Sequence, residues 1–290
     1  MDLDGDGNLD ILSGSYSRME KSMAGLFQVL HGTKDGTFRK AEALKGTDDK
    51  PLIIPTKEDK DEQITEKICT RPFAVDWDGD GQLDLVVGNF SGTFYWFKGK
   101  GKGKFDPKPE KILVDGKPLK IKGVHSDPFI VDWDGDGDLD LLTGSSDGGV
   151  YWAENKAGKG KPPVLKPLVA LVEAAPTRKY DATLREEDIN RPEYASRLWV
   201  ADVNGDGKLD LLVGDSVRLL SPAKGLSEAD MKKKLSEWQG AIQMASEAMS
   251  KTKDDKERAK LQKEYSKLYQ KRSEIVKEEP TGFVWLYLAK

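Results

Sequence analysis

Four short acidic segments carry the residues that could do chemistry. Each has the pattern Asp-x-Asp/Asn-x-Asp-Gly-x-x-Asp, and the copies begin at Asp2, Asp76, Asp132 and Asp202. Carboxylates at alternate positions of one short loop repel each other unless a cation neutralises them. Calcium prefers hard oxygen ligands held in a flexible loop of this kind. We therefore expect each segment to bind one Ca²⁺ ion, which gives about four sites.

Each position of the loop has a predicted role. Positions 1, 3, 5 and 9 supply side-chain oxygens, and the variable position 7 supplies its backbone carbonyl. Position 6 is always Gly, because the sharp turn there requires a positive φ. The predicted metal ligands are Asp2, Asp4, Asp6, Asn8 and Asp10 in the first loop; Asp76, Asp78, Asp80, Gln82 and Asp84 in the second; Asp132, Asp134, Asp136, Asp138 and Asp140 in the third; and Asp202, Asn204, Asp206, Lys208 and Asp210 in the fourth.

The acidic pattern has two other interpretations. An EF-hand or dockerin loop shares its first half but needs a Glu at position 12 and a helix on each side. Position 12 is Ser13, Val87, Thr143 or Val213, and the flanking segments have the composition of strands. The second alternative is four acidic turns without metal. Four copies of the same ligand set argue against it.

The segments around each loop predict the elements that hold it. In the second copy, PFAVDW at 72–77 leads into the loop and LDLVVG at 83–88 leaves it. A short turn then precedes the aromatic segment TFYWF at 93–97, and a Lys/Gly turn precedes a fourth apolar segment near residue 112. Four antiparallel strands repeated along a chain are typical of the blades of a β-propeller.

These motifs resemble the FG-GAP and VCBS-type repeats of bacterial secreted proteins, which are related to the calcium-binding blades of the integrin α-subunit propeller. The resemblance covers residues 1 to about 220 and the segment from about 281. It implies that positions 1, 3, 5 and 9 bind calcium through side chains and position 7 through its carbonyl. Asn204 departs from that pattern. The Phe-Gly and Gly-Ala-Pro signatures of integrins are absent, so integrin partners are not implied.

The expected fold is all-β: a β-propeller of four-stranded antiparallel blades, about four of them, with an inserted α-helical hairpin. The expected boundaries are 1–225 for the blades, 226–280 for the hairpin in the fourth blade, and 281–290 for a final propeller strand. Met1 directly precedes the first ligand, so the first blade lacks its first strand. We expect an N-terminally incomplete part of a larger ring; a complete four-bladed ring is the alternative.

Residues from about 227 to 279 have a helical rather than a β pattern. Ser227 and Asp230 resemble an N-cap with an acidic residue at N3. Apolar residues recur at three- and four-residue steps on either side of an interruption at 251–255, and Pro280 is expected to end the second stripe. The pattern predicts an αα-hairpin of coiled-coil type with arms of about 23 residues. Its apolar stripe forms either the seam between the arms or a surface for protein contact.

Composition excludes some classes of function. The formal net charge is −4, and the basic run at 98–104 is interpreted as a hairpin tip, so nucleic-acid binding is not indicated. No transmembrane run or signal peptide is visible, and the single cysteine, Cys69, is expected to be buried. Calcium sites of extracellular modules bind at about 10⁻⁴ to 10⁻³ M. On that chemistry we expect a secreted protein, extracellular or periplasmic.

The function expected from these features is a binding, adhesion or interaction scaffold, with structural Ca²⁺ on one face. In an antiparallel blade the metal loops lie on one face, and the long connections fall on the other, where we expect an unknown protein or polysaccharide to bind. Candidate groups there are Tyr16, Arg71, Asn89, His125, Asp127 and Asp215. No catalytic constellation is visible, so an enzyme is not expected. The alternatives are a propeller-based polysaccharide lyase or hydrolase, and a subunit scaffold that uses the helical hairpin.

Overall fold

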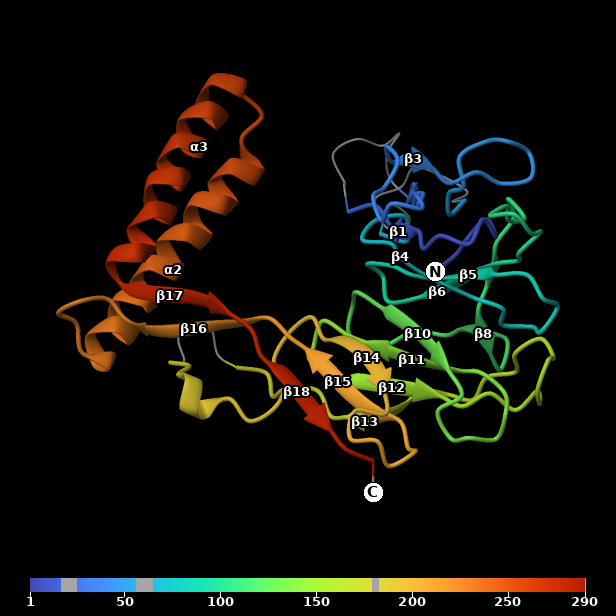
Figure 1. Ribbon diagram of the computed structural model, residues 1–290. Helices are drawn as coiled ribbons and strands as arrows, with labels where there is room; N and C mark the ends of the chain where they lie inside the picture. The colour runs from blue at the N-terminus through green and yellow to red at the C-terminus, as the bar shows by residue number, and fades with distance from the viewer. Residues whose placement is uncertain (17–24, 56–64, 179–182, 290) are drawn as a thin grey trace. The chain divides into compact units, whose positions relative to one another are not determined.

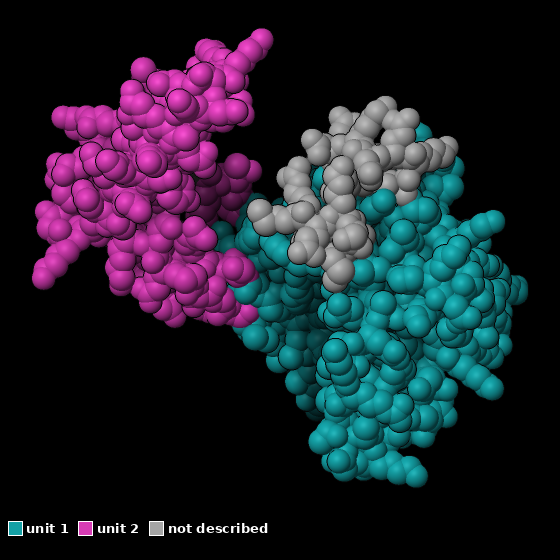
Figure 2. All heavy atoms as spheres, turned by 90° about the horizontal axis from the view of Figure 1, so that it is seen from above, with its two compact units in different colours: residues 1–175, 192–215, 284–290 teal, residues 176–191, 216–283 magenta. Residues whose placement is uncertain are grey.

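The structure is a computed structural model that describes residues 1–16, 25–55, 65–178 and 183–289. These described residues are mostly β, and they form several antiparallel sheets and two α-helices (Figure 1). The chain forms two compact units. The first comprises Met1–Ala175, Pro192–Asp215 and Val284–Lys290, and the second comprises Pro176–Arg191 and Ser216–Phe283 (Figure 2, teal and magenta).

The first unit contains one antiparallel sheet for each acidic loop. The strands of the first sheet are β1 (Ile11–Ser13), β2 (Gln28–Leu30) and β3 (Glu42–Ala43); those of the second are β4 (Arg71–Val75), β5 (Asp84–Gly88), β6 (Phe94–Phe97) and β7 (Glu110–Lys111). The third contains β10 (Asp127–Val131), β11 (Asp140–Gly144), β12 (Val150–Ala153) and β13 (Val169–Val172); the fourth contains β14 (Arg197–Ala201), β15 (Asp210–Gly214) and β18 (Val284–Tyr287). A small ribbon pairs β8 (Leu113–Val114) with β9 (Lys117–Pro118). In the second to fourth sheets the acidic loop joins the first two strands.

Strand register repeats from sheet to sheet. A cross-strand apolar row on one face of each of the last three sheets consists of Phe73, Val86 and Trp96; Phe129, Leu142 and Trp152; and Trp199, Leu212 and Leu286. The following sheet covers the first two rows, so that Val86 and Leu142 are fully buried. The aromatic residues that begin the three rows also contact each other. The ring centroids of Phe73 and Phe129 are 4.9 Å apart, and those of Phe129 and Trp199 are 5.5 Å apart. The third row is open to solvent, and Trp199 is 63 % exposed.

The glycine that ends the second strand of a repeat allows the next repeat to come close. A Cβ built on Gly88 would lie 2.2 Å from the carbonyl oxygen of Ser126, and one on Gly144 would lie 2.1 Å from that of Ser196. The hydroxyls of those serines accept hydrogen bonds from the backbone amides of Asn89 and Ser145. A residue with a Cβ would not allow the two backbones to come this close. This close contact fixes consecutive sheets against each other.

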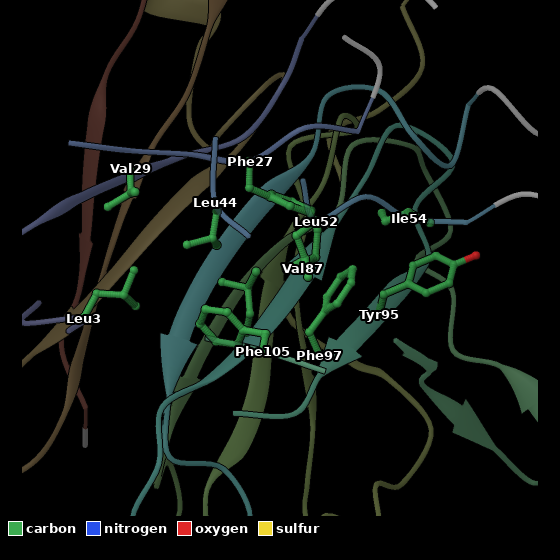
Figure 3. Packing of buried hydrophobic residues seen from close by; sticks show 11 residues of the cluster. Leu3, Phe27, Val29, Leu44, Leu52, Ile54, Val87, Tyr95, Phe97 and Phe105 are labelled. Carbon is green, nitrogen blue, oxygen red and sulfur yellow. The ribbon is translucent and has the colours of Figure 1, made fainter. Parts of the chain in front are cut away.

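A large apolar cluster lies between the first and second sheets (Figure 3). Phe27 and Phe97 meet edge to face, with ring centroids 5.7 Å apart, and both are fully buried. Phe105, from the turn after β6, and Leu3, from the first acidic loop, belong to the same cluster. Burial of such aromatic residues contributes much of the stability of a small sheet. The first loop is therefore anchored in the core at its second residue.

The second unit is a helical hairpin on a β-ribbon. The ribbon pairs β16 (Val217–Pro222) with β17 (Val276–Thr281), and the helices are α2 (Glu228–Lys251) and α3 (Asp255–Gln270), with short 3₁₀ turns η2 (Glu186–Asp188) and η3 (Lys271–Glu274). Ser227 and Asp230 form the expected capping box. Met231 and Leu235 of α2 are fully buried against the ribbon in a small core. None of the described helices is both long and apolar enough to cross a membrane.

The prediction that Pro280 ends the second helix was wrong. Helix α3 ends at Gln270, and Pro280 lies in β17, opposite Arg218. The apolar residues with helical spacing continue beyond α3 because Ile275 and Val276 pack into the core of this unit rather than along a helix. Proline is tolerated in this strand because each strand of a two-stranded ribbon has an outer edge, where no backbone N–H is needed for pairing. This unit is thus wider than the expected insertion at 226–280, since the strand at 217–222 belongs to it.

Candidate metal centres

Two glycines give each acidic loop its tight curve. The residues at positions 4 and 6 have positive φ in all four loops, for example 79° at Gly5 and 88° at Gly7. A Cβ added at either of these glycines would meet nothing within 4 Å. At Gly5 and Gly7 the requirement is therefore conformational rather than steric, because L-residues with a Cβ rarely adopt this region. At Gly79 it is also steric, since a Cβ there would lie 2.4 Å from the Cα of Gly160. The curve turns the side chains of positions 1, 3 and 5 towards one point.

Three loops bring their first three carboxylates together. Single oxygen atoms of each set lie within 4.8 Å of one another, and the sets are Asp2, Asp4 and Asp6; Asp76, Asp78 and Asp80; and Asp132, Asp134 and Asp136. In the fourth loop Asn204 takes the middle place, and its amide donates a 3.1 Å hydrogen bond to Asp206 Oδ2. The fourth loop thus has one charge fewer, and one of its oxygens is already in use.

The loop carboxylates also organise the backbone. Asp132 Oδ1 accepts the amide of Gly135 at 2.8 Å, and its Oδ2 accepts the amide of Gly137 at 3.1 Å. At position 5, the backbone amide of Asn8 holds the pKa of Asp6 below its ordinary value, and the amide of Lys208 does the same for Asp206. These carboxylates are therefore ionised at neutral pH, as metal ligands must be.

Orphaned oxygens in the second loop fit a cation. Asp76 Oδ1 and Asp78 Oδ1 are buried and accept no hydrogen bond. A buried ionised oxygen without a partner is costly, and a bound cation would satisfy both. The oxygen-only donor set matches the preference of calcium. The residues at positions 1, 3 and 5 therefore fit the ion predicted for them.

Position 9 has a different environment from positions 1, 3 and 5. Its side chain is buried in every repeat, and both of its oxygens accept backbone amides. One amide comes from position 2 of the loop. The other comes from just after the strand that pairs with the strand leaving the loop. These contacts are Leu3 and Gly32 to Asp10; Trp77 and Gly99 to Asp84; Trp133 and Asn155 to Asp140; and Val203 and Ala289 to Asp210. Position 9 thus clamps the loop onto the sheet.

Burial dominates the electrostatics of the clamp. It raises the pKa of Asp84 and of Asp140 above the ordinary value, and the nearest position-3 aspartate raises it further, while the backbone amides oppose both effects. A divalent ion held at position 3 would favour the ionised clamp. The loop carboxylates and the clamp are therefore coupled through charge.

Two of the side chains at position 7 make hydrogen bonds to nearby groups. Asp138 is 4 % exposed, and its Oδ2 accepts the amide of Gly158 from the turn after β12 at 2.7 Å. Asn8 donates its side-chain amide to Asp6 Oδ1 at 2.9 Å. The side chain of Asp138 is thus held by the turn after β12, and that of Asn8 by the position-5 carboxylate.

Comparison with known families agrees with this repeated geometry. Residues 76–143 and 132–213 each match the FG-GAP-like repeat. Residues 76–213 thus consist of FG-GAP-type repeats. The two matches overlap and span the second, third and fourth acidic loops of the FG-GAP-like region. Among curated proteins, none has significant sequence similarity to the chain.

A second polar group lies at the start of the first strand of the last three sheets, at the end away from the acidic loops. Arg71, Asp127 and Arg197 are the first residues of β4, β10 and β14. Asp127 Oδ2 is 3.1 Å from Arg197 Nη1, and Asp127 Oδ1 is 3.9 Å from Arg71 Nε. Arg71 Nη1 is buried and has no hydrogen-bond partner among the described residues. We call these three residues the charged cluster.

Most residues predicted for that face lie near the charged cluster. His125 stacks edge to face on Phe90 at 4.6 Å, and burial lowers its pKa, as does the charge of Arg71. Tyr16 is 79 % exposed and acts electrostatically on Arg71. Asn89, in contrast, is fully buried in a turn, where it bonds Thr93. Parts of the long connections at 15–25, 45–70 and 173–196 lie outside the described residues.

Two functional candidates were missed from the sequence. Arg197 stands five residues before its loop, as Arg71 and Asp127 do, so alignment of the repeats would have found it. His31 contacts Asp4 and Asp10 of the first loop, with Nδ1 3.3 and 3.5 Å from their carboxylate oxygens. No local motif indicates this contact, because His31 follows β2 and meets the loop only in the folded sheet.

Proposed function

We propose that this protein is a calcium-stabilised β-propeller that serves as an extracellular or periplasmic interaction scaffold. The observation that carries the proposal is the convergence of three carboxylates in each of three loops, with buried oxygens in the second loop that lack any partner. In the second and third loops calcium would join the loop to its sheet, because position 3 and the position-9 clamp are electrostatically coupled there. The match to the FG-GAP-like repeat supports a role in interaction.

The propeller proposal includes a ring larger than four sheets. In the second and third sheets the apolar row is covered by the next sheet, whereas the row of Trp199 is open. A Cβ on Gly214 would meet nothing within 4 Å, although the matching Gly88 and Gly144 each touch the next repeat. The open apolar row and the free space at Gly214 support a further sheet packed against the fourth. A crystal structure of a closed four-sheet ring that contains this chain alone would exclude it.

The fourth loop should bind calcium most weakly. It lacks one carboxylate, and ligand charge tunes calcium affinity. Substitution Asn204→Asp should tighten the weakest step of a calcium titration by roughly tenfold. Isothermal titration of the wild type and the variant would measure this. Equal affinities, or a fourth loop tighter than the others when each loop is disabled in turn, would contradict the assignment.

The charged cluster is the centre of the proposed recognition face. It carries two guanidinium groups for one carboxylate, and it lies at the ends of the inner strands away from the metal loops. Guanidinium groups recognise carboxylates and phosphates, so an anionic group on a protein or polysaccharide is the expected ligand. Binding of an acidic polysaccharide such as polygalacturonate, compared with a neutral glucan, would test this. Loss of binding is expected in Arg197→Gln but not in Lys117→Gln.

Replacing Asp127 by Asn should change how stability depends on pH. Burial raises the pKa of Asp127 to about 6 from an ordinary 3.8, although Arg71 opposes the shift. The ionised form is thus less favourable in the folded state, so the wild type should lose stability relative to Asp127→Asn as pH rises from about 4 to about 6. A shift of about two units corresponds to at most about 3 kcal/mol.

Urea unfolding of both proteins across that pH range would measure the difference. Asp115→Asn, at an exposed turn, is the control and should give a flat difference. The same flat result for Asp127→Asn would show that the Asp127 carboxylate is not held in a desolvated site.

A further inference from the structure

The first repeat differs from the others by an imidazole beside its loop. His31 directly precedes Gly32, whose amide donates to the clamp residue Asp10 at 2.9 Å. The residues in the same place in the other repeats precede Gly99, Asn155 and Ala289, and they are Lys98, Glu154 and Leu288. Only the first repeat therefore offers a nitrogen ligand next to its carboxylates.

The imidazole nitrogen is aimed between two carboxylates. His31 Nδ1 lies 3.3 Å from Asp4 Oδ2 and 3.5 Å from Asp10 Oδ1, and the three ligand atoms all lie within 4.8 Å of one another. This nitrogen is buried and makes no hydrogen bond within the described part of the chain. A tetrahedral ion with bonds of about 2.0–2.1 Å holds its ligand atoms about 3.3 Å apart. The spacing therefore suits a small metal ion shared by the three residues.

The other ring nitrogen has the partner that such a ligand requires. His31 Nε2 lies 3.4 Å from Glu42 Oε1 at the start of β3. Metal-bound histidines usually donate their second N–H to a carboxylate, which fixes the ring and its tautomer. A cavity of about 210 Å³ borders Asp4, His31 and Glu42, and it leaves room for water at a fourth coordination position.

We propose that Asp4, Asp10 and His31 bind a transition-metal ion of the zinc type, with Glu42 as the positioning residue. Calcium takes oxygen ligands, whereas imidazole suits Zn²⁺, Cu²⁺ and Ni²⁺. This inference deepens the proposed function. It rests on the proposed function in one respect, because Asp4 and Asp10 belong to the first calcium loop. The two ions would compete there, so the first loop would respond to zinc and the other three would not.

Cobalt is the probe for this site, because tetrahedral Co²⁺ absorbs visible light and Zn²⁺ displaces it. The full chain without added calcium should bind one equivalent of Co²⁺ with that absorption, excess calcium should weaken this binding, and Zn²⁺ should abolish the absorption. His31→Gln should lose the absorption, whereas His125→Gln, which changes the other histidine, should keep it. Glu42→Gln should keep the fold and weaken Zn²⁺ binding by about tenfold or more.

Calcium titration of the same variants separates this inference from the proposed function. His31→Gln should leave calcium binding to the second, third and fourth loops unchanged. Cobalt bound without any calcium binding would sustain the zinc-type site and contradict the calcium scaffold. Calcium bound without tetrahedral cobalt absorption, or equal cobalt binding by wild type and His31→Gln, would overturn the zinc-type site alone.

Discussion

Removal of calcium should lower the melting temperature of the first unit more than the fourth-loop or charged-cluster substitutions considered above. An ion that binds only the folded state stabilises it by about 2.7 kcal/mol per site at a hundredfold excess over Kd. For a domain of this size, each kcal/mol moves the melting temperature by about 2–4 °C. Loss of one filled loop should therefore lower it by about 5–10 °C, and loss of several by more.

Scanning calorimetry with millimolar calcium, and then with a calcium chelator, would measure the change. The second unit provides an internal control, because none of the four loops lies within it. Any separate transition that it makes should stay at the same temperature. Magnesium demands near-ideal octahedral geometry, so it should restore less of the loss. Coincident melting curves with and without chelator would mean that the loops fold without metal.

The second large effect is expected at the position-9 clamp and should not require calcium. Asp140 is fully buried and accepts the amides of Trp133 and Asn155. In Asp140→Asn an NH₂ group faces one of these donors, so at least one buried amide loses its acceptor. Each buried unsatisfied group costs about 1–3 kcal/mol, which predicts a loss of about 2–4 kcal/mol even in chelator.

Asp136→Asn is the matched control for the clamp. Asp136 is an exposed position-5 residue of the same loop, and its Oδ1 accepts the amide of Asp138. Its substitution should weaken calcium binding by the third loop and leave stability in chelator nearly unchanged. Urea unfolding of both variants in calcium and in chelator gives the four values needed. If Asp140→Asn destabilised only the calcium form, position 9 would act as a ligand and not as a clamp.

Local chemistry explains which parts of the structure could be predicted. The loops, their glycines and the flanking strands follow from short-range requirements for positive φ and from short apolar segments, and these are visible in one repeat. Ser227 and Asp230 likewise predicted the start of α2 from four residues. Such features need no knowledge of distant segments.

The features that were missed depend on contacts between distant segments. The stripe of 261–275 has helical spacing throughout, but Val276 pairs with Pro222 and ends the helical region early. The double acceptor role of Asp84 depends on Gly99, fifteen residues away in sequence, and is invisible in the loop motif. His31 reaches its loop only because β1 and β2 pair. Spacing within a motif indicates ligand type, but tertiary pairing decides which oxygens are free.

A direct count of bound calcium tests the central claim most sharply. The full chain, freed of metal and titrated with calcium in a calorimeter, should bind about four ions, three of them more tightly than the last. Variants Asp78→Asn and Asp134→Asn should each remove one of the tighter steps. Absence of binding at millimolar calcium, with the chain folded, would contradict the account that these loops are metal centres.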